Sequence, residues 1–555
     1  MSLSVSKKAA GPLRTGFLHR ASPFVFWGSF ALVLAWAAFQ RFSLPLVPAF
    51  DPDIQGYLNP ALSALAGGPF IQVEQRAFLY PAILLAVLKG TGSLAGIVVF
   101  QHLTSLACGV VWMVIWRAWV AFLPKSGVRL YVVPWIGLAG AALYLWGADT
   151  IFFGIQVRPE AVFPLFASLQ VACQMLYIHA RWPVQQAAEG RWGLYLSGAG
   201  ALLFAAMAYN LKPSWGFAVL TSPLLLVAGI IFRRGALPVG ATVWPLILGA
   251  LLAGLFVVGL PRVLGWVPER ESSDFLPKHL FSVHADIILD NLQGQVAGGR
   301  AAPDDLRFAG SLARSVEESR AALGPYRLLG HNPDYLMYGS SALAELPGVT
   351  SGQERRSYYL KTYLDSLRHF PARYLRKWLI QMRAAVMPDP KFLFRPIGKL
   401  KKLYQISSAC RIPPPPSLPP DLARSLESAA AETQRLAEAL PEKTRTGPGW
   451  MRAVAQAGSV LLGLSLGVCL VSLAVLPFCP AGHERAVLSS ALIAGSFLLS
   501  SLTVALVHSF DIDRYNSLQS WIAWLVISCG AALAFSLSGP HFHRAAGAIH
   551  HRLRD

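Results

Sequence analysis

The sequence has little charge and little cysteine. Charged residues make up 14% of its 555 residues and hydrophobic residues 54%, a balance that excludes an ordinary soluble domain and is typical of a polytopic membrane protein. The six cysteines are scattered without any C-x-x-C pair, which excludes a cysteine-rich disulfide scaffold or zinc site. No DNA- or RNA-binding motif accompanies the formal net charge of +19. We therefore expect no nucleic-acid partner and attribute the charge to cytoplasmic loops and anionic lipids.

Long apolar runs occupy much of the chain. They predict an all-α polytopic membrane protein with about ten transmembrane helices, further juxtamembrane helices and a mainly helical outer domain. The run at 78–90 is too short to cross a hydrocarbon core of ~30 Å, so we expect a juxtamembrane or half-inserted helix there. The ten predicted spans are 23–40, 94–118, 131–147, 160–180, 194–210, 214–231, 239–260, 455–477, 487–508 and 516–537.

The spans divide the chain into three predicted parts. Residues 1–260 form an N-terminal transmembrane module with a first outer loop at 41–93, residues 261–454 form an outer domain, and residues 455–555 form a C-terminal transmembrane module. Placing both termini inside gathers Arg and Lys in the inner loops, including the basic pair that begins at Arg233, as the positive-inside rule requires.

The outer domain contains one clearly amphipathic segment. Residues 355–382 place apolar side chains at helical spacing with basic residues alongside, and Pro371 should kink or split this helix. The helix either lies on the membrane surface or packs on its own domain, and the sequence leaves both open. The proline-rich stretch from Ile412 to Pro420 is a predicted spacer, and Asp421 is a predicted cap of the helix that follows.

The first outer loop places ionisable residues directly beside an apolar span. Asp51 and Asp53 follow the first span, and Arg76 precedes a Leu-Tyr-Pro sequence. Carboxylates next to a membrane span are costly unless they sit in water or serve a function. Taken alone, the Asp-Pro-Asp sequence is also compatible with a solvated turn.

The order of residues in this loop resembles the first outer loop of the GT-C glycosyltransferases, in particular the aminoarabinose transferases and protein mannosyltransferases. The matching positions are Asp53, Tyr57, Ala61 to Ala66, Arg76 and Leu79-Tyr80-Pro81. The resemblance implies a GT-C-like fold, a catalytic loop at 41–93, and a bacterial inner-membrane enzyme with its active site on the outer face. Such an enzyme would move a hexose or pentose from a polyprenyl-phosphate donor to an unidentified lipid, glycan or protein acceptor in the envelope, with inversion at the sugar.

The resemblance also assigns roles to acidic residues. Asp53 matches the family's acidic position and would accept the proton of the acceptor hydroxyl, with Asp51 as the alternative. Glu160 resembles a second acidic position, although Glu stands there in place of Asp; equally, Arg158 and Glu160 could form an ordinary surface ion pair. Asp51 and Asp53 could together hold Mg²⁺ or Mn²⁺, but family members differ in metal dependence, so the cofactor requirement stays open.

Basic residues on the same predicted face would hold the donor phosphate. By resemblance the predicted substrate- and phosphate-binding residues are Arg76, Lys212, Arg514, Tyr57, Tyr80 and Arg158. Each basic residue alone could instead be an interface anchor whose charged end reaches water. We expect Asp53, Arg76, Glu160 and Lys212 to share one cavity, with Arg514 at its rim.

Two other functions compete with this hypothesis: a transporter or lipid flippase, and a membrane scaffold without catalytic activity. Transporters place ionisable residues near the membrane midplane and often show repeated halves. The predicted spans here are nearly free of charge, there is no internal repeat, and the charged residues gather at one face, which favours the glycosyltransferase. The predicted partners are therefore the polyprenyl-phosphate sugar, membrane lipids and an envelope acceptor.

Overall fold

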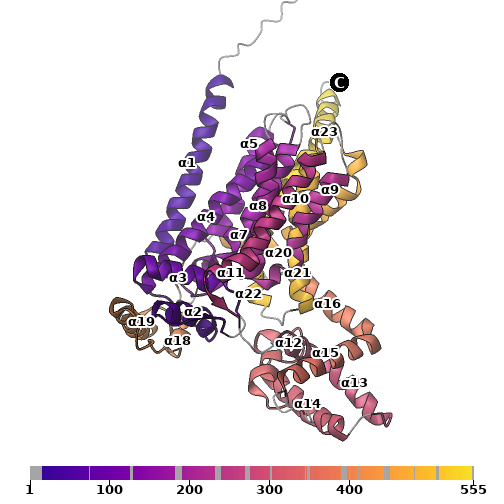
Figure 1. Cartoon of the computed structure of the whole chain (residues 1–555). Coiled ribbons are helices and arrows are strands. Elements are labelled where there is room, and N and C mark those ends of the chain that lie inside the picture. The colour runs from indigo at the N-terminus through magenta and orange to yellow at the C-terminus, as the bar shows by residue number, and fades with distance from the viewer. Residues whose placement is uncertain are drawn as a thin grey trace, which may run out of the picture.

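The chain folds into a helical bundle that carries further helices at one end (Figure 1). The computed structural model describes all residues except 1–14, 74–75, 125–128, 182–190, 232–238, 269–274, 301–302, 344–345, 347–350, 389–396, 399, 411, 443, 446–449, 480–481, 508–511 and 553–555.

Eight of the described helical segments are long and apolar enough to span a membrane. They are Pro23–Phe42, Leu94–Val120, Pro159–Arg181, Trp192–Leu211, Val243–Val263, Gln456–Ala474, Glu484–Val507 and Ser520–Ser538. Six of them lie in α1 (Thr15–Phe42), α4 (Leu94–Val120), α8 (Arg191–Leu211), α20 (Met451–Ala474), α21 (Glu484–Val507) and α23 (Ser520–Arg552). Pro159–Arg181 joins η1 (Pro159–Ala161) to α7 (Phe163–Arg181), and Val243–Val263 runs from α10 (Val239–Gly254) through η5 (Leu255–Gly259) into α11 (Leu260–Val263). The predicted all-α polytopic architecture is confirmed.

Shorter apolar helices fill the remaining predicted positions. They are α3 (Leu79–Thr91), α5 (Arg129–Leu145), and η4 (Phe217–Leu220) followed by α9 (Thr221–Ile231). The predicted spans 131–147 and 214–231 are thus short helices in the described chain, whereas the other eight match the long ones. The run at 78–90 forms α3, a helix of 13 residues that is shorter than a membrane span, as its length predicted.

The centre of the bundle packs large aromatic side chains against small ones. Trp112, Trp116 and Trp119 stack along α4, with ring centroids 5.9 and 5.1 Å apart, and all three are buried. Gly137 of α5 lies against this stack, since a Cβ there would come within 2.1 Å of Trp116 Nε1. Small residues allow such close helix contacts within membranes.

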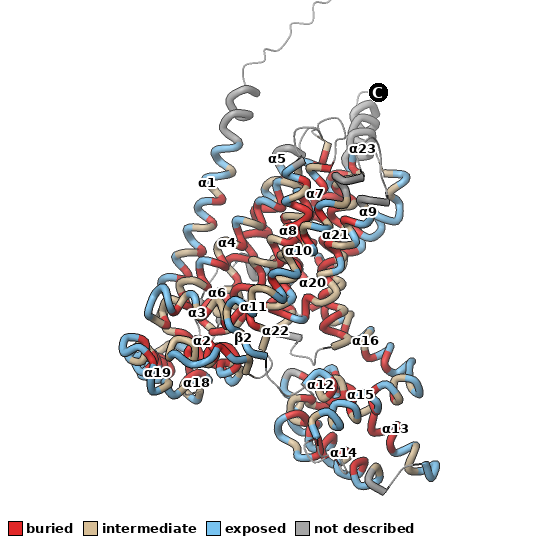
Figure 2. Tube along the Cα trace, in the orientation of Figure 1, coloured by how far each residue is buried: buried red, intermediate tan, exposed pale blue. Residues whose placement is uncertain are grey.

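The outer surface of the bundle has the character of a lipid-facing surface. Figure 2 shows exposed residues along α1, and these include large apolar side chains such as Phe24, which is 82% exposed. A soluble protein would bury side chains of this size, whereas a bilayer solvates them.

The loops that hold the candidate site gather at one end of the bundle. In Figure 1, α1 begins and α23 ends at one end, whereas α2 (Ile54–Leu65), α3 and the helices of the predicted outer domain lie at the other. In the first loop, β1 (Phe70–Ile71) pairs in parallel with β2 (Trp266–Val267). Because β2 follows α11 (Leu260–Val263), this pairing ties the first loop to the start of the outer domain.

The described outer helices form two groups. The first comprises α12 (Phe275–Val283), α13 (Ala285–Ala297), α14 (Pro303–Ala321), α15 (Gly352–His369) and α16 (Pro371–Val386), most of which share an apolar core of their own. The second comprises α18 (Leu400–Ser408), α19 (Pro420–Ala439) and a short antiparallel pair of β3 (Ile397–Gly398) with β4 (Thr444–Arg445).

Two proline effects decide where outer helices begin. Pro371 splits the amphipathic segment, as predicted, because it opens α16 at a position where a proline costs no helical hydrogen bond. Pro420 opens α19 in the same way, so Asp421 lies in the first turn and the predicted Asp421 cap is wrong. The proline-rich stretch predicted to be a spacer lies between α18 and α19.

Candidate functional site

The first outer loop is fixed by a segment far along the chain. Ala49 forms an isolated parallel bridge, in which its N–H donates to Ile155 O at 3.0 Å and its carbonyl accepts from Val157 N–H at 3.2 Å. This bridge places Asp51, two residues after Ala49, beside Arg158.

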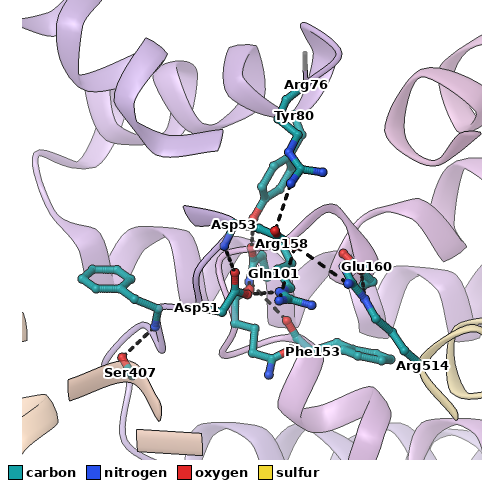
Figure 3. Close-up of polar contacts among 12 residues, drawn as sticks. Asp51, Asp53, Arg76, Tyr80, Gln101, Phe153, Arg158, Glu160, Ser407 and Arg514 are labelled. Atoms are coloured by element: carbon teal, nitrogen blue, oxygen red, sulfur yellow. Dashed lines mark hydrogen bonds and ion pairs between the residues drawn. The ribbon is translucent and has the colours of Figure 1, made fainter. Parts of the chain in front are cut away.

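Two aspartates before α2 meet three arginines (Figure 3). Asp51 is buried and forms an ion pair with Arg158, and its Oδ1 accepts a hydrogen bond from the backbone N–H of Asp53 at 2.8 Å. Asp53 is partly exposed, and its Oδ1 accepts a hydrogen bond from Arg76 Nη2 at 2.9 Å. The Oδ2 atom of Asp53 lies 3.5 Å from Arg158 and 3.8 Å from Arg514. Asp53 is therefore the more accessible carboxylate of the two.

Glu160 is a third carboxylate, and it is buried. It lies in η1 (Pro159–Ala161) at the entry to α7, and its Oε1 accepts hydrogen bonds from Lys212 Nζ at 2.8 Å and from Arg514 Nε at 2.6 Å. Lys212 follows α8 and Arg514 lies in α22 (Ile512–Leu518), so three separate segments meet at one oxygen atom. Arg158 and Glu160 each bond other partners and are largely buried, so the alternative of a surface Arg158–Glu160 pair is wrong.

Lys212 is the cation whose charge is most easily changed. Its pKa is lowered to about 8, chiefly by burial and then by the nearby Arg514 guanidinium, against the opposing effect of Glu160. Its Nζ also lies 5.4 Å from the ring centroid of Tyr515. The ammonium is therefore charged at neutral pH and loses its proton under mildly alkaline conditions.

The charges of this cluster do not cancel. The three carboxylates are Asp51, Asp53 and Glu160, and the four cations are Arg76, Arg158, Lys212 and Arg514. Four positive charges against three negative ones leave an excess of one positive charge at neutral pH. Such an excess, presented by guanidinium and ammonium groups, suits a phosphate or another small anion.

A cavity of about 850 Å³ gives access to this cluster. The cluster and its aromatic neighbours contribute Asp53, Tyr57, Arg76, Tyr80, Lys212, Arg514 and Tyr515 to its lining. Of the four residues expected to share one cavity, Asp53, Arg76 and Lys212 line it. Arg514, expected at the rim, lines it as well. Glu160 does not line this cavity; it is buried and forms ion pairs with Lys212 and Arg514, which do line it.

The rest of the cavity wall combines the bundle with the outer domain. Leu220 of η4 and Val507 of α21 contribute apolar surface, while Phe275 and His279 of α12 and Asp334 come from the outer domain. The cavity thus has an apolar side toward the bundle and a mixed side toward the outer helices.

Tyr57 and Tyr80, the two tyrosines predicted at the site, have different surroundings. The Arg76 guanidinium lies over the Tyr57 ring, 5.0 Å from its centroid, and burial raises the pKa of Tyr57. Tyr57 meets Tyr80 edge to face at 5.3 Å. The Tyr80 hydroxyl points inward and donates to Gln101 Oε1 at 2.6 Å, so Tyr80 supports the site by packing beneath Tyr57.

The aspartate pair does not fit a divalent cation in this arrangement. Asp51 is bonded to Arg158 and Asp53 to Arg76, so a metal would have to displace guanidinium groups before it met two free carboxylates. In the described parts of the chain, no group of three or more His, Cys, Asp or Glu residues could hold a metal ion. The sequence left the need for Mg²⁺ or Mn²⁺ open, and it stays open.

Sequence reasoning assigned no role to several residues that line the cavity, among them Asn210 and Tyr515. Asn210, near the end of α8, accepts a hydrogen bond from the Leu79 N–H at 3.0 Å and so anchors the start of α3. Tyr515 lies beside Lys212 and lines the cavity. A polar residue two positions before Lys212, at the end of an apolar span, is the signal that could have identified Asn210.

The chain was compared with known proteins. No protein-family model and no curated protein matches it. Among solved structures, it is similar to the crystal structure of ArnT from Cupriavidus metallidurans bound to undecaprenyl phosphate, with 12% sequence identity and a TM-score of 0.26. The match covers 87% of this chain and 77% of that one. A TM-score this low does not establish a shared fold.

Proposed function

We propose that this chain is a membrane glycosyltransferase that moves a sugar from a polyprenyl-phosphate donor to an envelope acceptor at one membrane face. The observation that carries the proposal is the placement of Asp53 beside Arg76, Lys212 and Arg514 in the wall of one cavity. A carboxylate that can accept a proton thus lies next to cations that can hold a leaving phosphate.

The proposed reaction is a single displacement at the sugar. The acceptor hydroxyl oxygen forms a bond to the anomeric carbon while the bond from that carbon to the phosphate oxygen breaks. The hydroxyl proton passes to Asp53, and the electron pair of the broken bond stays on the lipid phosphate. The three cations of the cavity wall would stabilise the charge that develops there. Inversion of the anomeric centre follows from a single displacement.

The apolar side of the cavity suits the lipid part of the donor. Leu220 and Val507 line it from η4 and α21, both of which belong to the membrane bundle. A polyprenyl chain could therefore stay in the membrane while its phosphate reached Arg76 and Lys212. By the resemblance of the first loop, the membrane would be a bacterial inner membrane and the cavity would open on its outer face.

Binding of a polyprenyl phosphate tests this proposal without knowledge of the sugar or acceptor. We expect the purified protein in nanodiscs to bind it, and Arg76→Ala to weaken binding about 10- to 100-fold, the usual effect of losing hydrogen bonds to a charged group. Arg76→Lys should restore binding only in part, because an ammonium lacks the guanidinium fork. The matched control is Arg435→Ala, since Arg435 is exposed on α19 and pairs only locally with Glu432. Equal affinity in wild type and Arg76→Ala would contradict the proposal.

A further inference from the structure

The helix pair α18–α19 lies directly under the loop that carries the aspartates. Leu400 and Tyr404 of α18 and Leu436 of α19 share a buried apolar cluster with Ala49 of the first loop and Ile155 of the segment that pairs with it. Figure 1 shows both helices at the same end of the bundle as α2 and α3. The pair therefore packs on the backbone that leads into Asp51.

Hydrogen bonds from α18 hold this backbone just before the aspartates. Ser407 Oγ accepts from the Phe50 N–H at 2.7 Å, and the Tyr404 hydroxyl donates to Val47 O at 2.7 Å. Ser407 is 1% exposed and Tyr404 is fully buried, so water does not readily replace either contact.

Two further serines of this region, Ser417 between α18 and α19 and Ser425 of α19, bond backbone away from the aspartates. Ser417 Oγ donates to Ala66 O at 2.8 Å, just after α2, and Ser425 Oγ accepts from the Leu94 N–H at 3.0 Å, at the start of α4. These contacts are of the same kind, so they provide internal controls for the pair at Ser407 and Tyr404.

We infer that α18 is a positioning element for the site, and that Ser407 and Tyr404 fix the geometry of Asp51 and Asp53. Phe50 adjoins Asp51, whose side chain accepts from the Asp53 N–H and whose carbonyl accepts from the Ile54 N–H at 3.0 Å. A shift at Phe50 is therefore passed to both carboxylates. Neither Ser407 nor Tyr404 lines the cavity, so they act through the loop.

Amide hydrogen exchange tests the positioning directly and does not depend on any enzymatic activity. In the full-length protein in nanodiscs, we expect Ser407→Ala to raise exchange at Phe50 and also at Asp53 and Ile54, by about fivefold for one lost hydrogen bond. Tyr404→Phe should act in the same direction. Ser425→Ala, the control, should raise exchange at the start of α4 and leave Asp53 unchanged.

Exchange that rises at Phe50 but not at Asp53 or Ile54 would overturn the inference, because the contact would then be purely local. Ser407→Thr keeps the hydroxyl and should restore wild-type exchange at Asp53. Failure of Ser407→Thr to restore it, while Ser407→Ala raises it, would likewise contradict a role for the hydroxyl.

The effect on turnover rests on the proposed function. With a polyprenyl-phosphate sugar as donor, we expect Ser407→Ala to lower kcat about tenfold with donor KM unchanged, since misplacing a reacting group slows the chemical step. Ser425→Ala should keep wild-type kcat. Unchanged kcat in Ser407→Ala would overturn the inference about α18. Absence of transfer by the wild type would instead contradict the proposed function, and the exchange experiment would then decide the role of α18.

Discussion

Every carboxylate of the site is bonded by at least one cation. Asp53 meets Arg76, Asp51 meets Arg158, and Glu160 meets both Lys212 and Arg514. Paired in this way, the cations are held at fixed positions before any ligand arrives, and such preorganised charge is what stabilises a developing anion efficiently.

Lys212 gives the site a pH dependence whose sign follows from its lowered pKa of about 8. Below that pH the ammonium is charged and can hold phosphate; above it the amine is neutral and contributes no charge. We therefore expect affinity for a polyprenyl phosphate to fall as pH rises through and beyond about 8. Titrating binding from pH 7 to 10 measures this.

Lys212→Arg is the matched variant for the pH experiment, because a guanidinium stays charged throughout that range. Its binding should vary less with pH than that of the wild type. If both proteins showed the same pH dependence, Lys212 would not be the group responsible.

Site residues that lie close together in the sequence were easier to predict than contacts between segments that lie far apart in it. Asp53 and Arg76 lie in one short loop, so the resemblance of that loop could name both as site residues, although it did not predict that they form an ion pair. The Asp51–Arg158 pair and the Phe50–Ser407 hydrogen bond join distant segments, and no periodicity or spacing in the sequence encodes such partners. The sequence therefore predicted the types of residue at the site more completely than their partners.

At the scale of elements, α16 supports one of the two alternatives that the sequence left open, because the helix packs on its own domain; contact with the membrane surface stays a prediction. Tyr374 and Lys377 are buried against the outer domain, where Lys377 bonds Asp286 at 2.7 Å. The exposed side of the same helix carries Leu375 and Leu379, which are 54% and 59% exposed. Lys377 thus faces the outer domain, unlike the exposed basic residues of the same helix.

We expect the exposed side of α16 to contact anionic lipid headgroups. The helix also packs against α20 and α21, which places it at the edge of the membrane bundle, and Arg376 and Arg383 are exposed beside its leucines. Each base near a charged surface contributes about 1 kcal/mol. Arg376→Glu combined with Arg383→Glu should therefore raise amide exchange in α16 in anionic nanodiscs.

The control for the α16 experiment is the lipid itself. In nanodiscs of neutral lipid, the double variant and the wild type should exchange alike. A double variant that matched the wild type in anionic nanodiscs as well would rule out headgroup contact through these residues.

At the scale of the whole molecule, different segments of the chain lie at the two ends of the bundle. The start of α1 and the end of α23 share one end, while both groups of outer helices occupy the other (Figure 1). Helices α2 and α3, which contribute Tyr57 and Tyr80 to the cavity, lie at that second end as well. A first helix that begins and a last helix that ends on the same side agree with an even number of crossings. Which end faces the cytoplasm is a prediction from the positive-inside rule.

Reporter fusions test this orientation. A fusion after Arg234, which lies outside the described residues, should report a cytoplasmic position, and one after Gly294 of α13 should report the opposite side. The same signal from both fusions would contradict the predicted topology and would place the cavity on the wrong face for the proposed donor.

The central claim is that Asp53 takes the proton of the acceptor while the neighbouring cations hold the donor phosphate. Asp53→Asn keeps the size of the side chain and removes the base, so we expect transfer from a polyprenyl-phosphate sugar to fall roughly 10²- to 10⁴-fold. Binding of a polyprenyl phosphate should persist, and Glu427→Gln, an exposed carboxylate change on α19, should leave transfer unaltered. Measured turnover of Asp53→Asn equal to that of the wild type would contradict the account.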